Sequence, residues 1–259
     1  MLLRVEDLVV RFGGLTAVDH MALAVQEGEI IGLIGPNGAG KSTLLNAVSR
    51  LVPAEGHVTL HRRDRDPVDL LTVPPWTVVR HGVARTFQHP QLAPDLTVAA
   101  NMGLGLFARS RTSWLAAGLR LPSVRAEERR VQEDVVRTAE FLGVAQWLDQ
   151  LPGSLPYGIQ KLVELGRAIL AHPVLLLLDE PAAGLNSAEK AVMQRLLLEV
   201  RQAYGLSMIV VDHDMEFIFG LSDRIYAMNF GTLLASGTPD AIRGNAAVQE
   251  AYLGQEDDR

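Results

Sequence analysis

The chain has 259 residues and a formal net charge of −6, so it has room for one large or two small domains, and broad electrostatic binding to DNA or RNA is not expected. Its hydrophobic content of 48% and charged content of 21% are typical of a globular protein. It contains no cysteine, which excludes disulfides and thiolate metal sites.

The N-terminal stretch MLLRVEDLVV carries Arg4, Glu6 and Asp7 among its apolar residues. It is therefore expected to be neither a signal peptide nor a membrane anchor. Later apolar runs, such as 174–178, are far shorter than the ~20 residues that a membrane-spanning helix needs. Any role at a membrane is therefore expected to come from docking onto another chain.

Residues 35–43 read GPNGAGKST and lie between an apolar run, 29–34, and a predicted helix. They fit the phosphate-binding pattern G-x-x-x-x-G-K-[ST] in its strand–loop–helix setting, which disfavours an ordinary glycine-rich turn. The glycines let successive backbone N–H groups point into one concavity, where the positive end of the helix adds to the attraction for phosphate. Lys41 would contact the β- and γ-phosphates, and the Ser42 hydroxyl can ligate Mg²⁺. The predicted nucleoside triphosphate site comprises Gly35, Asn37, Gly38, Ala39, Gly40, Lys41, Ser42 and Thr43.

The rest of the chain predicts an α/β core of residues 1–88 and 154–259, interrupted by a helical subdomain of residues 89–153. Short strands and turns fill residues 1–34, whereas apolar residues of the insertion recur at helical spacing up to Leu142. Residues 109–125 mix apolar and arginine side chains, so they either cover the core or form a surface for a partner.

Asn186 is a predicted helix N-cap, because Glu189 follows three residues later. The helix that begins here is expected to bury Val192, Leu196 and Val200 on one face.

The apolar strand predicted at 174–178 ends in Asp179 and Glu180. At the carboxyl end of a parallel strand beside a phosphate loop, the first acid can hold Mg²⁺. The second acid can accept a proton from an attacking water. The competing interpretation is a strand that ends in a solvated turn.

Two further polar residues are candidates for the same site. His213 follows the predicted strand 206–211, and it is either a surface histidine or a sensor of the γ-phosphate. Gln88 joins the core to the helical insertion. It is either a polar linker residue, or it reaches Mg²⁺ and the attacking water and reports their presence to the insertion.

The chain resembles the nucleotide-binding subunits of ATP-binding cassette (ABC) transporters over nearly its whole length. The resemblance is carried by segments that occur in the order typical of the family: GPNGAGKST, TFQ, LPYGIQK, LLLLDEP, AAGLN and VDHD. The resemblance implies an α/β P-loop NTPase fold of the ABC ATPase type. Its parts would be a core with a parallel sheet, N-terminal antiparallel strands and a helical subdomain insertion. Phe12 lies where the family places an aromatic ring that stacks on adenine.

A narrower resemblance connects the chain to ATPase subunits of importers for branched-chain and related hydrophobic amino acids or amides. It is carried by RFGGLTAVD, GVARTFQ, LPYGIQK, DEPAAGLN, DHDM, SDRIY and AYLG. The signature segment, LSGGQ in most of the family, reads LPYGIQ here and retains Gly158, while Pro156 replaces the serine. The resemblance implies that Gly158 contacts the ATP of a partner subunit.

The family mechanism implies a head-to-tail pair of ATPase subunits, a second copy or a related chain, which encloses two ATP molecules with Mg²⁺. Catalysis would use Lys41, Gln88, Glu180 and His213, and Mg²⁺ would be held by Ser42, Gln88 and Asp179. The expected partners are membrane permease subunits and, indirectly, an extracytoplasmic solute-binding protein, but no nucleic acid. The chain would then lie peripherally on the cytoplasmic face of the cell membrane.

The motifs alone do not exclude some other functions. An ABC ATPase of another transport system, such as lipid or lipopolysaccharide export, would share most of them, and so would a non-transport regulatory ATPase. A GTPase is disfavoured, because Lys41, Lys161 and Lys190 are not followed by the residues of an [NT]-K-x-D guanine-reading segment.

Overall fold

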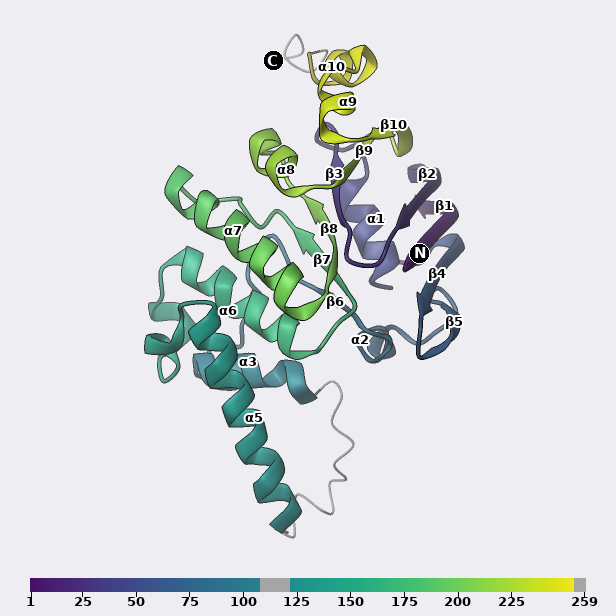
Figure 1. Cartoon of the computed structure of the whole chain (residues 1–259). Coiled ribbons are helices and arrows are strands. Elements are labelled where there is room, and N and C mark those ends of the chain that lie inside the picture. The colour runs from purple at the N-terminus through teal and green to yellow at the C-terminus, as the bar shows by residue number, and fades with distance from the viewer. Residues whose placement is uncertain (108–121, 254–259) are drawn as a thin grey trace.

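The computed structural model describes residues 1–107 and 122–253 (Figure 1). The partner surface hypothesised for residues 109–125 lies outside the side chains described. Among the described helices, none is long and apolar enough to cross a lipid bilayer.

An antiparallel sheet forms the N-terminal part of the fold. Its strands are β1 (Leu3–Phe12), β2 (Leu15–Val25), β4 (Glu55–Arg62) and β5 (Arg65–Asp69), in the order β2-β1-β4-β5. The apolar residues of β1 at Leu3, Val5, Leu8 and Val10 are buried. The predicted N-terminal antiparallel strands are therefore confirmed.

A second sheet of six strands has the order β10-β9-β3-β8-β7-β6. Five of its strands are parallel, and β10 pairs antiparallel with β9 at one edge. Strands buried on both faces are continuously apolar, which explains the apolar runs in the sequence. The strand bounds are β3 (Ile30–Ile34), β6 (Val83–Arg85), β7 (Leu175–Asp179), β8 (Ser207–Val211), β9 (Arg224–Asn229) and β10 (Thr232–Gly237).

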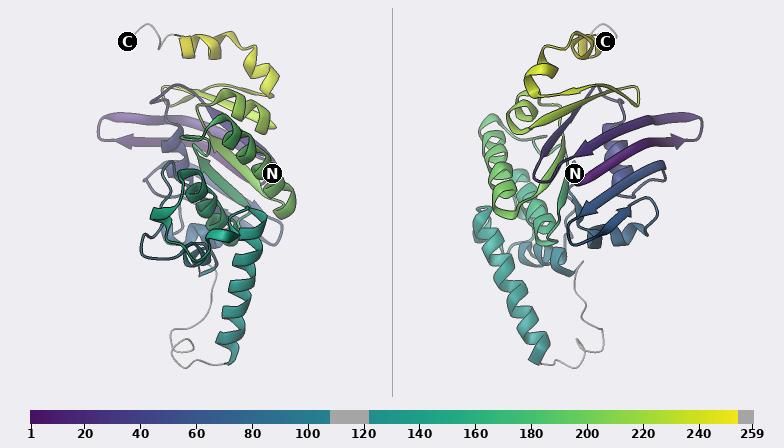
Figure 2. Two further views of the ribbon diagram at one scale, coloured as in Figure 1. Left: turned by 90° about the vertical axis from the view of Figure 1, so that its left-hand side faces the viewer. Right: turned by 45° about the vertical axis from the view of Figure 1, so that its right-hand side comes forward.

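Alternate residues of the parallel strands enter two different hydrophobic clusters, as a side-chain period of two requires. On one face, Leu177 and Val211 pack with α1 (Lys41–Val48) and with the antiparallel sheet. On the other face, Leu178 and Val210 pack with α6 (Tyr157–Leu170), α7 (Ser187–Tyr204) and α8 (Met215–Leu221). The parallel sheet thus lies between two layers (Figure 2).

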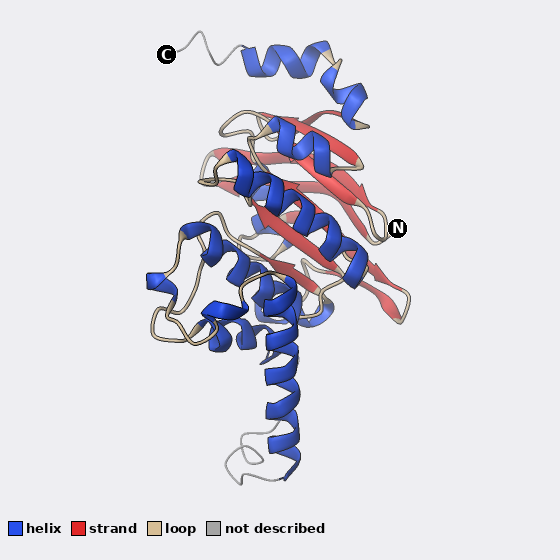
Figure 3. Cartoon of the chain, turned by 60° about the vertical axis from the view of Figure 1, so that its left-hand side comes forward, coloured by secondary structure: helices blue, strands red, loops and turns tan. Residues whose placement is uncertain are grey.

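The helices α3 (Val98–Phe107) and α5 (Pro122–Phe141) pack against α6, and α5 projects from the core as the long helix of Figure 3. Of the apolar residues that repeat at helical spacing, Val135, Ala139 and Leu142 are buried, and Val131 is partly buried against the same cluster. Because α6 lies beyond residue 153, its contacts with α3 and α5 cross the predicted subdomain boundary. The domain limits of 1–88, 89–153 and 154–259 stay a prediction.

The short helical elements complete the chain. They are η1 (Pro75–Thr77), α2 (Val78–His81), η2 (Ala145–Trp147), η3 (Pro152–Ser154), α9 (Pro239–Arg243) and α10 (Ala246–Leu253). Helices α9 and α10 lie at one end of the molecule, next to β10 (Figure 1).

Helix α7 begins with the predicted capping box, in which Asn186 accepts from the Glu189 N–H at 3.0 Å and the Glu189 carboxylate accepts from the Asn186 N–H. The prediction of its buried face is wrong at Val192, which is 47% exposed, whereas Leu196 and Val200 are buried. Residues spaced by four drift about 40° around a helix at each step, so Val192 lies well away from Val200. Met193 takes its place in the core.

Candidate nucleotide-binding and catalytic site

The phosphate loop runs from the end of β3 to the start of α1, and neighbouring backbone packs tightly around it. Gly35 (φ 152°) lies against the carbonyl of Met228 on β9, and Gly40 (φ 98°) against the carbonyl of Ala17 on β2. A Cβ at either position would collide with that carbonyl, so both positions require glycine. The helix α1 begins without a side-chain cap, which leaves its first N–H groups for an anion.

Lys41 is folded back into its own loop. Its Nζ donates to the carbonyls of Gly35 at 2.7 Å and Pro36 at 2.9 Å. Burial lowers the pKa of Lys41, whereas the nearby Glu180 and Asp179 act in the opposite direction. An ammonium has three donors, so one remains for a phosphate oxygen. Lys41 is thus held in place before any ligand binds.

The side chains of Ser42 and Asp179 meet across the loop. The Ser42 hydroxyl donates to Asp179 Oδ1 at 3.1 Å. The other carboxylate oxygen of Asp179 accepts from Arg85 at 2.7 Å, in an ion pair with both side chains less than a tenth exposed. Arg85 also donates to Asn46 on α1 and to Ser49, the C-cap residue of that helix. No sequence motif predicts this role for Arg85; its place three residues before Gln88, at the end of a strand, is the available signal.

Glu180 takes a backbone conformation that is rare for its residue type, with φ 52°. Its N–H donates to the carbonyl of Val211 on β8 at 2.7 Å, and its carbonyl accepts from Lys161 Nζ at 2.6 Å. These two bonds support a conformation that costs about 1–3 kcal/mol elsewhere. The side chains of these two acids have different neighbours, since Asp179 contacts Ser42 and Arg85 and Glu180 contacts His213. The contact of Lys161, one turn into α6, is likewise not predicted by any sequence motif.

The carboxylate of Glu180 is buried next to His213. The distance from His213 Nε2 to Glu180 Oε2 is 2.9 Å, and this contact is not counted among the hydrogen bonds of Oε2. Among the described residues, Oε2 therefore has no hydrogen-bond partner, although it is buried. A buried carboxylate oxygen in this condition is suited to accept a proton from a bound ligand.

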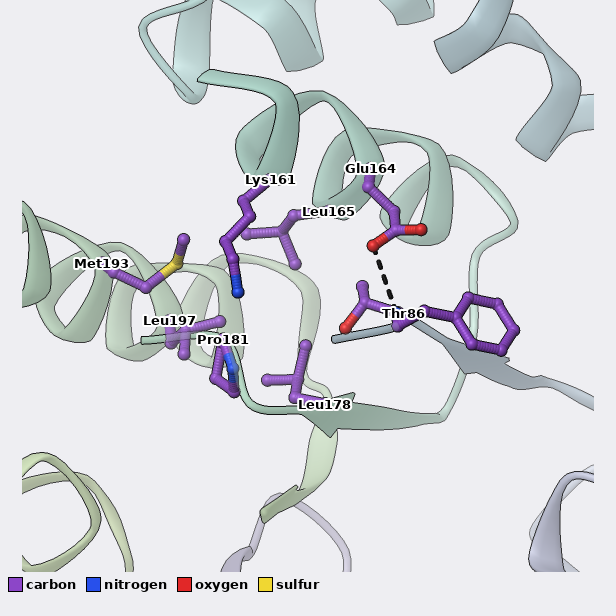
Figure 4. Close-up of a pocket in the computed structure, with 9 residues that line it drawn as sticks. Thr86, Lys161, Glu164, Leu165, Leu178, Pro181, Met193 and Leu197 are labelled. Atoms are coloured by element: carbon purple, nitrogen blue, oxygen red, sulfur yellow. Dashed lines mark hydrogen bonds between the residues drawn. The ribbon is translucent and has the colours of Figure 1, made fainter. Parts of the chain in front are cut away.

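Gln88 is exposed, and the segment around it is tied to α6 by a buried carboxylate. Glu164 Oε2 accepts from the Phe87 N–H at 3.1 Å, and its Oε1 accepts from the Gln91 N–H at 2.9 Å. Figure 4 shows Glu164 reaching from α6 toward the segment after β6, and Lys161 pointing toward Pro181. Burial raises the pKa of Glu164, and the two amides oppose this change.

Two more bonds strengthen the same connection. The hydroxyl of Tyr157 donates to the Gln88 carbonyl at 2.9 Å, and Arg167 donates to the Gln91 carbonyl at 2.6 Å. A movement of α6 must therefore carry the Gln88 segment with it.

The comparisons with known proteins assign this arrangement to a family. Residues 18–183 match the family model described as ABC transporter, and residues 232–258 match one described as branched-chain amino acid ATP-binding cassette transporter. The chain belongs to the ABC transporter family.

Relatives in that family match along the whole chain. The high-affinity branched-chain amino acid transport ATP-binding protein LivG of Salmonella typhimurium is 38% identical over 98% of both chains. Its counterpart BraF of Pseudomonas aeruginosa is 35% identical over 98% of both chains. A solved nucleotide-free ATP-binding cassette from an ABC transporter has a TM-score of 0.82 at 30% identity, covering 97% of this chain and 98% of that one. The expected ABC ATPase fold is confirmed, and with it ATP hydrolysis coupled to transport.

Within this ABC ATPase, two of the predicted ligand contacts lie outside the cluster around Lys41. Phe12 is 48% exposed at the end of β1, while the next strand, β2, touches the loop at Ala17. Gly158 lies at the start of α6 beside Leu185 and Glu189, not beside the phosphate loop of its own chain. The roles of Phe12 in adenine stacking and of Gly158 toward a partner stay predictions.

The residues at the loop fit a magnesium ion as well as a nucleotide. Ser42 Oγ and Asp179 Oδ1 converge within 3.1 Å of each other, and both are the hard oxygen ligands that Mg²⁺ prefers. The described residues contain no group of three or more acidic or histidine side chains placed to hold a metal. Phosphate oxygens would therefore have to complete the coordination, with Gln88 as a further predicted ligand.

Proposed function

We propose that this ABC ATPase uses MgATP hydrolysis to power the import of branched-chain or other hydrophobic amino acids, or amides, through membrane permease subunits. Support comes from the match of residues 232–258 to the branched-chain amino acid cassette model and from the transport named for LivG and BraF. The import system would include an extracytoplasmic solute-binding protein, which this chain does not contact itself.

The observation that carries the catalytic part is the buried Oε2 of Glu180 beside His213. In the proposed reaction a water oxygen bonds to the γ-phosphorus, the bond from this phosphorus to the bridging oxygen breaks, and Glu180 accepts the water proton. Lys41 and the loop N–H groups stabilise the charge on the phosphate oxygens, and His213 contacts the γ-phosphate. Bound Mg²⁺ would neutralise phosphate charge.

A head-to-tail ATPase pair accounts for the position of Gly158. Helix α6 begins at Tyr157 without a side-chain cap, because Pro156 replaces the usual serine. The N–H groups of its first turn then suit the γ-phosphate of a nucleotide on a partner subunit, whether a second copy or a related chain. Closure would complete each site with residues from both subunits.

A groove beside the Gln88 segment is the proposed docking place for a cytoplasmic segment of the permease. It measures about 300 Å³ and lies between the core and α3, with Phe87 and Leu104 in its wall. Trp76 and Leu51 in the same wall are 75% and 54% exposed, so two large apolar side chains are accessible to a partner at one place. Docking here would place the chain on the cytoplasmic face of the membrane and connect the permease to Gln88.

The test is Glu180→Gln in a complex with the permease, reconstituted in proteoliposomes. The amide keeps the shape of the side chain but cannot take the proton. Hydrolysis and leucine uptake should therefore fall by about 10²-fold or more, while ATP binding persists. Lys41→Ala should instead weaken ATP binding itself.

Unchanged steady-state hydrolysis by Glu180→Gln would remove Glu180 from the base role. The proposed substrate class would be contradicted if the wild-type complex took up none of the branched-chain or hydrophobic amino acids or amides in the presence of ATP.

A further inference from the structure

A long-range hydrogen bond connects the C-terminal helix to the first residue of the phosphate loop. The hydroxyl of Tyr252, on α10, accepts from the backbone N–H of Gly35 at 2.7 Å, across 217 positions of sequence. The next carbonyl along the loop, that of Gly35, accepts from Lys41. Both sides of Gly35 are thus held, and Met228 closes against its Cα.

Helix α10 is itself docked on the core. Val248 is 4% exposed, and the Tyr252 ring packs on the cluster that includes α7 and α8. Burial raises the pKa of Tyr252, and the hydrogen bond from Gly35 acts in the opposite direction. Gly35 belongs to the predicted nucleotide site, but the N–H groups expected to face the phosphates are those of roughly residues 38–43, and the Gly35 N–H already donates to Tyr252. The bond therefore shapes the loop and does not compete with a ligand.

We propose that Tyr252 is a positioning residue for the phosphate loop, and that docking of α10 sets the affinity of this loop for MgATP. The effect on affinity rests on the proposed nucleotide function, whereas the hydrogen bond does not. Two coupled equilibria influence each other equally, so MgATP must in turn favour the docked helix. The C-terminal elements from β10 to α10 would then act on the site through Tyr252.

Tyr252→Phe tests this, because it removes the hydroxyl and keeps the ring. Amide exchange at Gly35, measured by NMR, should become about tenfold faster. The Kd for MgATP should rise roughly three- to tenfold, which corresponds to the loss of one hydrogen bond. Tyr226→Phe is the matched control, since that hydroxyl also bonds backbone, at Ala24, but away from the loop. It should leave the Kd and the Gly35 exchange as in the wild type.

Val248→Ala retains the hydroxyl but weakens the docking of α10, so it should shift both measurements in the same direction by a smaller factor. In the wild type, MgATP should slow amide exchange along α10. Unchanged Gly35 exchange in Tyr252→Phe, or equal Kd values for Tyr252→Phe and Tyr226→Phe, would overturn the inference. A wild-type chain without affinity for MgATP would contradict the proposed function. The exchange rate of the Gly35 amide would still show whether Tyr252 holds that N–H.

Discussion

Single cations hold the acidic residues of the site in place. Arg85 pairs with Asp179 where both are buried, and the ammonium of Lys161 holds the carbonyl of Glu180. Burial lowers the pKa of both cations, while the neighbouring carboxylates act in the opposite direction. Removal of one member of the Arg85–Asp179 pair leaves the other as an uncompensated buried charge.

Arg85→Met is expected to lower the free energy of unfolding by about 3–5 kcal/mol, because Asp179 would remain buried without its counter-charge. The measurement is chemical unfolding in the absence of nucleotide. The control is Arg11→Met, which breaks the exposed ion pair with Glu55 and should cost less than about 1 kcal/mol. Equal losses in the two variants would show that the Arg85–Asp179 pair contributes no more than a surface pair.

At the scale of elements, α6 connects three parts of the site. Its first turn carries Gly158, Lys161 reaches Glu180, and Glu164 binds the N–H groups on both sides of Gln88. Since these contacts come from one rigid helix, a push on α6 or α3 from a permease would reach Gln88 and the carbonyl of Glu180 together.

Glu164→Gln is expected to uncouple this helix from the Gln88 segment. One carboxylate oxygen becomes an NH₂ group, which cannot accept from a backbone N–H and leaves that donor unsatisfied at a cost of about 1–3 kcal/mol. Stimulation of hydrolysis by the permease should fall about tenfold, and basal hydrolysis by less. The two rates are measured with and without permease.

The exposed Glu199 on α7 provides the control, because Glu199→Gln changes the same atoms without burial. Equal permease stimulation in the wild type and in Glu164→Gln would argue against coupling through this carboxylate.

For the whole molecule, the arrangement of layers separates two half-sites. The phosphate loop follows β3, which lies between β8 and β9 in the six-stranded sheet, whereas Gly158 lies at the start of α6, on the helical face. One chain therefore presents a cradle and, elsewhere, an uncapped helix end, and a second subunit can bring the two together.

Glu180→Gln is expected to dimerise in MgATP, because the unhydrolysed γ-phosphate keeps both half-sites occupied. Analytical ultracentrifugation should give about twice the 28.2 kDa of the chain with MgATP and a single chain with ADP. The double variant with Lys41→Ala should stay monomeric. If the partner is a related chain, the heterodimer should form under the same conditions. No change in mass with nucleotide for either pairing would contradict the shared site.

Local patterns determined much of this protein. The phosphate loop, the strands ending at Asp179 and at Val211, and the capping box at Asn186 depend on neighbours within a few residues, so the sequence alone predicts them. The family resemblance rested on the same segments, and the comparisons confirmed it.

Only the tertiary structure decided what supports these segments. Arg85 meets Asp179 across 94 positions, Glu164 meets the Phe87 N–H across 77, and Tyr252 meets the Gly35 N–H across 217. Such contacts follow from the order and register of the strands and from the packing of helices on the sheet. They leave no period or spacing in the sequence, because each partner is selected by its place in space and not by its distance along the chain.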